Sequence, residues 1–189
     1  MSIGKVRLLF ALAALFSNPY RVCRKFLQKR GEAEIFGYGE TPFATLETIA
    51  QKCRLSPADQ WLDLGAGRGA GCFWMALSTG CKAAGVEWVP SFVRLARLIA
   101  WLSGTDRVSF ECREMEEADF SRATAVYLYG TCLPDEKVAR LAEKMKQLPR
   151  GARVVSVSEP LSAPHLPLIE TFPLSYPWGD TEGYLHEKQ

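Results

Sequence analysis

A hydrophobic strand that runs directly into a glycine-rich turn constrains this chain more than any other feature. The strand segment is Trp61-Leu62-Asp63-Leu64, and the turn is Gly65-Ala66-Gly67-Arg68-Gly69. Glycines at such a turn let a ligand approach the backbone closely at the carboxyl end of a buried strand. Residues 71–79 then have the composition of a helix. The segment predicts the first β–α unit of a Rossmann-like α/β fold.

The rest of the chain extends this unit into an alternating pattern of strands and helices. Beyond residues 61–64, strands are expected at residues 83–87, 108–112, 125–129, 152–158, 169–175 and 183–187. Helices are expected at residues 5–16, 19–30, 45–53, 71–79, 91–102 and 135–148, the first two being separate or one helix broken at Pro19. Alternation of this kind predicts a mostly parallel sheet covered on both faces. The last two strands predict an antiparallel C-terminal hairpin.

The spacing of the glycines bears on the ligand. Gly65, Gly67 and Gly69 lie two residues apart, and Asp63 precedes the first glycine by two positions. A dinucleotide motif instead has the spacing G-x-G-x-x-G, so the present form favours S-adenosylmethionine (SAM) over a nicotinamide or flavin cofactor. Glu87 ends the second strand and can bind the ribose hydroxyls. A glycine-rich turn without any ligand remains the third interpretation.

The N-terminal residues are basic and apolar. An apolar run at residues 8–16 follows Lys5 and Arg7, and more basic residues follow up to Arg30. The run is shorter than the stretch of about 20 apolar residues that spans a bilayer. It predicts a helix that packs on the domain or lies at a membrane surface, and the alternative is a cleaved signal peptide.

Composition limits the class of protein. The chain of 189 residues has a formal charge of only +2, which gives no indication of nucleic acid as a partner. Its six cysteines form no C-x-x-C pair and have no histidine nearby, so no metal site is predicted and a reducing, cytoplasmic environment is expected. The expected location is therefore the cytoplasm, with peripheral membrane association as an option.

Several motifs together resemble one family. Tyr38-Gly39-Glu40-Thr41 precedes a helix and the glycine-rich turn, and Gly85-Val86-Glu87 follows them. Leu133-Pro134-Asp135 and Tyr184-Leu185-His186 lie further along the chain. This combination resembles the disruptor-of-telomeric-silencing family of histone lysine methyltransferases and its small prokaryotic relatives. The resemblance begins near residue 36 and implies a class I methyltransferase fold with a seven-stranded sheet.

The resemblance also implies roles for particular residues. Glu40 would bind the amino group of SAM, and Thr41 would bind the amino-acid end, although Thr41 could cap the following helix in place of this role or together with it. Glu114 and Met115, after the third strand, occupy the position that usually meets the adenine. With Asp63, Gly65, Gly67, Gly69 and Glu87, these residues form the predicted cofactor site.

The acceptor side departs from the family pattern. Tyr127-Leu128-Tyr129-Gly130-Thr131 stands where asparagines are usual, and Gly183 stands where a second channel tyrosine is expected. Tyr129 and Trp178 are the predicted catalytic residues, because aromatic rings can hold an ammonium group. The alternative is that Tyr127 or Tyr129 faces the core and that Trp178 caps it.

The sequence therefore predicts an N-terminal helical extension, residues 1–35, and a SAM-dependent methyltransferase domain, residues 36–189. The main functional prediction is transfer of a methyl group from SAM to a protein lysine side chain. A small-molecule or lipid acceptor is the second hypothesis, and a SAM-binding scaffold without turnover is the third. Membrane-surface association through the basic, apolar N-terminal helix is a separate expectation.

Overall fold

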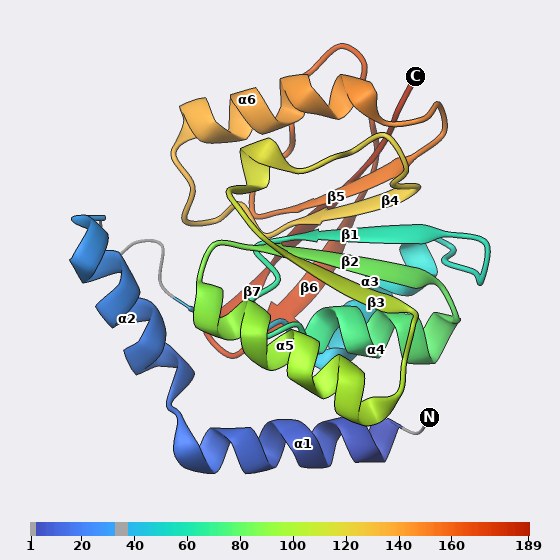
Figure 1. Ribbon diagram of the computed structural model, residues 1–189. Helices are drawn as coiled ribbons and strands as arrows, with labels where there is room; N and C mark the ends of the chain where they lie inside the picture. The colour runs from blue at the N-terminus through green and yellow to red at the C-terminus, as the bar shows by residue number, and fades with distance from the viewer. Residues whose placement is uncertain (1–2, 33–37) are drawn as a thin grey trace.

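The computed structural model describes residues 3–32 and 38–189, apart from the side chain of Phe16. Its strands form a seven-stranded sheet in the order β3-β2-β1-β4-β5-β7-β6 (Figure 1). The strands are β1 (Gln60–Leu64), β2 (Lys82–Glu87), β3 (Val108–Cys112), β4 (Ala125–Leu128), β5 (Arg153–Val157), β6 (Leu168–Tyr176) and β7 (Gly179–Glu187). The helices are α1 (Ile3–Phe16), α2 (Pro19–Arg30), α3 (Phe43–Lys52), α4 (Ala70–Thr79), α5 (Pro90–Ser103) and α6 (Asp135–Lys144), with short 3₁₀ turns at Met115–Glu117 and Met145–Gln147.

The pairing of the strands confirms the predicted fold class. The first five strands in the chain are parallel to one another, and β7 pairs antiparallel with both β5 and β6. Strand order reverses at β1, which lies between β2 and β4. In open α/β sheets this point, at the carboxyl ends of the strands, is where ligands bind. The C-terminal hairpin is longer than predicted, because β7 begins at Gly179 rather than at Gly183.

Two hydrophobic cores lie on opposite faces of the sheet. One packs α3, α4 and α5 against side chains such as Trp61 and Phe110, and the other packs α6 against side chains such as Leu62 and Val126. The alternation of Trp61 and Leu62 between faces is the ordinary two-residue period of a strand. Both faces are covered, which accounts for the nearly continuous burial of β1 and β4.

The N-terminal helices form an outer layer. Asn18 caps α2, Pro19 begins it, and the break between α1 and α2 falls where Pro19 predicted it. Figure 1 shows α1 running along the outer side of α4 and α5, while α2 rises beside the sheet. None of the helices described is long and apolar enough to cross a membrane. The predicted boundary between extension and domain, at residues 35 and 36, lies outside the described residues.

Candidate functional site

The glycine-rich turn joins β1 to α4 at the carboxyl edge of the sheet. Gly65, Gly67 and Gly69 have φ angles of 87°, 55° and 86°, which are left-handed values that glycine adopts at little cost. The amides of Gly65 and Ala66 donate to the Val86 carbonyl at 2.9 and 3.0 Å, so the turn is fastened to the end of β2. The result is a glycine turn fixed at the carboxyl ends of β1 and β2, whose backbone a ligand can approach closely.

Glu87 lies beside this turn, at the end of β2. Its side chain is buried and accepts hydrogen bonds from the Gly67 amide at 2.8 Å and the Val89 amide at 2.7 Å. Burial raises the pKa of the Glu87 carboxyl, while the two amides oppose that rise. A carboxylate held in this way keeps further lone pairs for donors such as ribose hydroxyls.

Asp63 is the second buried acid at this edge. It lies on β1, and its Oδ2 atom accepts a hydrogen bond from the Cys72 thiol at 3.6 Å. Burial raises the pKa of Asp63 to about 7, although the Cys72 bond opposes the rise. Two buried carboxyls on adjacent parallel strands place negative charge beside the glycine turn. That environment suits a cationic ligand such as SAM.

Glu40 lies over the turn but is engaged in an ion pair. Its carboxylate pairs with the guanidinium of Arg68, with Nη2 to Oε1 at 2.7 Å, and the Tyr38 hydroxyl also donates to it. Arg68 Nε lies 2.9 Å from the Tyr38 hydroxyl oxygen. The ring of Tyr38 covers the turn so closely that a Cβ at Gly67 would lie 2.9 Å from it. Glu40 therefore has two partners, Tyr38 and Arg68, that the sequence motif did not indicate.

Thr41 joins the cofactor side of the site to the sheet. Its hydroxyl shares a 2.9 Å hydrogen bond with the hydroxyl of Tyr127, which shares another of 2.9 Å with Tyr176. Helix α3 has Pro42 at its N-cap and no side-chain cap. The alternative interpretation of Thr41 as a capping residue is thus wrong, because its hydroxyl is directed to Tyr127 instead.

Three aromatic rings form a row at the same edge. Tyr129 and Tyr176 have ring centroids 5.4 Å apart, and Tyr176 stacks on Trp178 at 5.3 Å with an interplanar angle of 15°. Trp178 occupies the two-residue turn between β6 and β7, where the pairing of Tyr176 with Gly179 closes the hairpin. Its side chain is 54% exposed, so the ring is not packed inside the core.

The two tyrosines at positions 127 and 129 differ in burial, because Tyr127 lies within β4 and Tyr129 lies just beyond its end. Tyr127 is buried and stacks on Trp61 at 5.7 Å, so it is the core-facing member of the pair. Tyr129 follows the end of β4 and is half-buried. Burial raises the pKa of the Tyr129 hydroxyl, which therefore stays protonated near neutral pH and can donate a hydrogen bond.

Gly183 explains one departure from the family pattern. It lies on β7, opposite Phe172 and next to Val157 of β5. A Cβ at this position would lie 2.7 Å from Leu174 and 2.8 Å from the Phe172 ring. No tyrosine could fit there, so this position cannot supply the second ring that the resemblance implied. Tyr176, which the sequence also offered as a possible wall of the acceptor site, lies in the Tyr-Pro-Trp-Gly segment beside Trp178.

One of the two predicted adenine-binding residues lies against the glycine turn. The Met115 methyl group is 3.7 Å from the position that a Cβ on Gly65 would occupy, so Met115 flanks the glycine turn. Glu114 is half-buried and pairs with Lys137 at 3.1 Å. Met115 is thus adjacent to the turn as predicted, whereas Glu114 is also held by α6. Among the described residues, no group of His, Cys, Asp and Glu side chains could hold a metal ion.

Comparison with known families decides the class of protein. The model of the ANTKMT methyltransferase domain matches residues 63–163, which is just over half of the chain. The chain belongs to the ANTKMT methyltransferase family. The match begins at Asp63 and includes the glycine turn, Glu87 and the loop that holds Tyr129. No curated protein matches the chain by sequence.

Solved structures with the same fold agree with this assignment. An RNA methyltransferase from Salinibacter ruber, solved with S-adenosyl-L-homocysteine, is 28% identical with a TM-score of 0.68, and the match covers 80% of this chain and 95% of that one. Two more distant structures show the fold alone. The putative methyltransferase yhhF from Escherichia coli has 13% identity, a TM-score of 0.67 and coverage of 80% and 88%. The geranyl diphosphate C-methyltransferase from Streptomyces coelicolor A3(2) has 16% identity, a TM-score of 0.63 and coverage of 77% and 79%.

The ANTKMT family member described here is therefore a SAM-dependent methyltransferase of class I, which confirms the predicted enzyme class and cofactor. The glycine turn therefore belongs to a SAM site and not to a nicotinamide, flavin or ligand-free turn. The assignment as an enzyme also replaces the hypothesis of a scaffold without turnover. When bound, SAM supplies the methyl group. The glycine turn and the two buried acids fit such a cationic, ribose-containing ligand.

Proposed function

We propose that this enzyme methylates a lysine side chain of a protein in the cytoplasm. The observation that carries the proposal is the row formed by Tyr129, Tyr176 and Trp178 at the carboxyl edge of the sheet. The family to which the chain belongs is a family of lysine methyltransferases, which supports the same acceptor class. A small-molecule, lipid or RNA acceptor is the competing assignment.

The three rings suit the chemistry of a lysine acceptor. Aromatic faces attract an ammonium group by cation–π interaction, so they can bind the side chain before transfer. The amine must then lose a proton, and an apolar surrounding lowers the pKa of a lysine by disfavouring its charged form. Tyr129, with its hydroxyl protonated, can donate to a neighbouring acceptor but is not suited to remove that proton at neutral pH. Alignment of the amine with the methyl group contributes most of the remaining rate.

Substitution of Trp178 by alanine is the direct test of this row. Because the ring is 54% exposed, we expect the variant to fold and to bind SAM normally. Loss of the cation–π surface should lower methyl transfer about tenfold or more. The measurements are transfer of labelled methyl groups, SAM affinity and thermal unfolding. The matched control is Ile169→Ala, which removes an exposed apolar side chain from β6 of the same hairpin. Full activity in the Trp178→Ala protein would remove this ring from the mechanism.

The acceptor class is tested separately with labelled SAM and a cell lysate. After incubation with the enzyme, label is counted in protein, RNA, lipid and small-molecule fractions. Label in protein bands that survives acid hydrolysis as methyl-lysine supports the proposal. Label confined to RNA, lipid or small molecules contradicts it and assigns the competing acceptor instead.

We also propose that the helical side of the enzyme associates with an anionic membrane surface. Helices α1, α2 and α5 carry nine of the 23 Lys and Arg residues and none of the 21 Asp and Glu residues. The remainder of the chain, with 14 basic and 21 acidic residues, has a formal charge of −7. Such segregation of charge onto three helices complements an anionic lipid surface.

Apolar side chains are exposed on the same helices. Leu8, Leu12 and Leu15 of α1 are 60%, 46% and 78% exposed, and Trp101 of α5 is 76% exposed. Helices α1 and α5 pack against each other, so these side chains belong to neighbouring elements. A basic helix with exposed leucines and a tryptophan is the composition that lies in a bilayer interface. Here that composition covers the outer layer of the molecule.

Substitution of both Leu8 and Leu15 by glutamine tests this association. The wild-type chain should co-sediment with vesicles that contain phosphatidylglycerol and weakly with phosphatidylcholine vesicles, because both charge and apolar area contribute. The double variant should bind the anionic vesicles at least about tenfold more weakly, since full burial of one leucine contributes roughly 1.5–3 kcal/mol and two leucines are lost. The matched control is the Leu168→Gln, Ile169→Gln pair on β6, where both side chains are also exposed. Equal sedimentation of all three proteins would exclude this membrane surface.

A further inference from the structure

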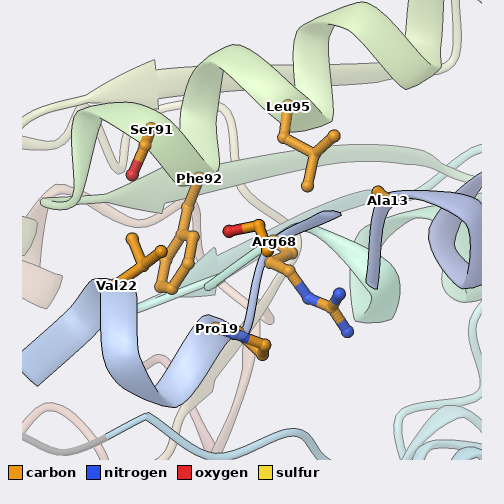
Figure 2. Close-up of a pocket in the computed structure, with 8 residues that line it drawn as sticks. Ala13, Pro19, Val22, Arg68, Ser91, Phe92 and Leu95 are labelled. Atoms are coloured by element: carbon orange, nitrogen blue, oxygen red, sulfur yellow. The ribbon is translucent and has the colours of Figure 1, made fainter. Parts of the chain in front are cut away.

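Arg68 is the one charged side chain within the glycine-rich turn, and it points away from the sheet. It stands between Gly67 and Gly69, and its side chain is only 11% exposed. It forms part of the wall of a cavity of about 250 Å³ between α1, α2 and α5 (Figure 2). In that view its guanidinium lies between Pro19 and Ala13. The turn at the cofactor site therefore reaches directly into the N-terminal layer.

The partners of Arg68 come both from α1 and from the segment that lies over the glycine turn. The Phe10 ring of α1 lies 5.6 Å from its guanidinium carbon, and the Tyr38 ring lies 6.0 Å from it. Nε and Nη2 donate to the Glu40 carboxylate at 3.0 and 2.7 Å. Phe10 in turn packs edge-on against Phe73 of α4 at 5.7 Å. One side chain thus joins α1 to the carboxylate that lies over the glycine turn.

Stability alone does not account for the buried guanidinium of Arg68. The Nη1 atom of Arg68 is buried and has no hydrogen-bond partner among the described residues. Burying a charged group with an unpaired donor costs free energy, which an apolar side chain of similar volume would avoid. Residues that lower stability in this way are expected at functional sites.

Helix α2 approaches the same edge from the side. Its Tyr20 ring meets the Tyr38 ring at 5.4 Å, and Phe26 meets Trp88 at 5.2 Å. Trp88 directly follows Glu87, the buried acid beside the turn. Both N-terminal helices therefore contact residues that are adjacent in the chain to the cofactor site.

We propose that Arg68 is a positioning residue through which α1 becomes part of the cofactor site. Seated on the Phe10 ring, it fixes the Glu40 carboxylate and the Tyr38 hydroxyl over the glycine turn. Glu40 in that position binds the ammonium group at the methionine end of SAM. The proposal rests on the assignment of Glu40 as a cofactor ligand, but it is independent of which acceptor is methylated.

The test uses two ligands that differ only at the methionine end. S-adenosylhomocysteine has the amino-acid group, and 5′-methylthioadenosine lacks it. For Arg68→Lys we expect binding of S-adenosylhomocysteine to weaken about tenfold or more, because a charge-assisted, forked contact to Glu40 is lost. Binding of 5′-methylthioadenosine should stay within about twofold, since the ribose and adenine contacts are unchanged. Calorimetric titration of the full chain measures both.

Two further variants separate positioning from simple stabilisation. Phe10→Leu should weaken S-adenosylhomocysteine binding in the same direction, whereas Phe43→Leu should not. Phe43 is a matched control because it also has a cation over its ring, Arg7 at 6.0 Å, and lies on α3. In a Glu40→Gln background, Arg68→Lys should have little further effect, because both changes act on one contact.

Three results would overturn the proposal. Unchanged S-adenosylhomocysteine affinity in Arg68→Lys would show that the guanidinium has no positioning role. Equal loss for both ligands would show a general distortion of the glycine turn. Additive effects of Arg68→Lys and Glu40→Gln would show that Arg68 does not act through Glu40. These outcomes are ligand affinities, so they could still be interpreted if the lysate assay showed no lysine methylation.

Discussion

Gly69→Ala is expected to lower the free energy of unfolding by about 2–5 kcal/mol. Two costs add at this position. An alanine at the φ angle of 86° found here costs about 1–2 kcal/mol in left-handed backbone strain. Its Cβ would also lie 2.5 Å from the Phe110 ring and 3.2 Å from the Ala96 methyl group, and overpacking of this kind costs about 1–3 kcal/mol. Urea unfolding followed by circular dichroism measures the sum.

Gly104→Ala is the matched control for this change. Gly104 ends α5 with a φ angle of 68°, but no atom lies within 4 Å of the position its Cβ would take. Its replacement should therefore show only the backbone strain of about 1–2 kcal/mol. Equal destabilisation by the two substitutions would mean that contact with Phe110 contributes nothing. The third glycine of the motif would then serve the turn alone, rather than the close packing of α5 and β3 beneath it.

Asp63→Asn should remove a large part of the pH dependence of stability. Burial raises the pKa of Asp63 in the folded state to about 7 from its ordinary value of 3.8. The folded state therefore binds this proton more tightly than the unfolded state, so stability is fully present below pH 4 and is lost as pH rises through about 7. A shift of this size corresponds to roughly 4 kcal/mol between those limits. Relative to wild type, the asparagine variant should gain up to that amount between pH 4 and pH 8.

Asp59→Asn is the control with the opposite sign. Burial raises the pKa of Asp59, but hydrogen bonds from Ser56 and Thr124 outweigh it and leave the pKa below its ordinary value. This carboxylate stabilises the folded state above its unfolded pKa, and that contribution is lost as pH falls. The asparagine variant should therefore lose stability relative to wild type as pH rises. A difference between wild type and Asp63→Asn that does not change with pH would contradict the burial of a titrating Asp63.

Local sequence signals predicted the sheet and its cofactor edge well. The apolar strand before Gly65 and the acid at Glu87 each follow from a few adjacent residues, because burial and turn geometry act locally. The exposed position of Trp178 followed in the same way, since proline and glycine bound a short turn at residues 177–179. Strand ends were less accurate, and β7 starts four residues earlier than expected.

Contacts between distant segments could not be read in this way. Arg68 occupies a variable position of the motif pattern, and nothing in its neighbours indicates that Phe10, 58 residues earlier, would lie over it. The pairing of Tyr127 with Thr41 likewise depends on the approach of two segments that only the folded sheet brings together. Gly183 was interpreted as a missing ring, whereas Phe172 and Leu174 of the adjacent strand occupy the space that a side chain would need.

The uneven distribution of charge gives the molecule an electric dipole. Its positive end is the layer of α1, α2 and α5, and the remainder, with a formal charge of −7, is its negative end. In the field of an anionic surface such a molecule rotates before contact, so productive encounters outnumber those of a randomly oriented body. At physiological ionic strength the field extends about 8 Å, which confines this torque to the last step of approach. Added salt should therefore lower the rate of association with the surface more than it raises the rate of dissociation. We expect dissociation to depend mainly on the leucines of α1.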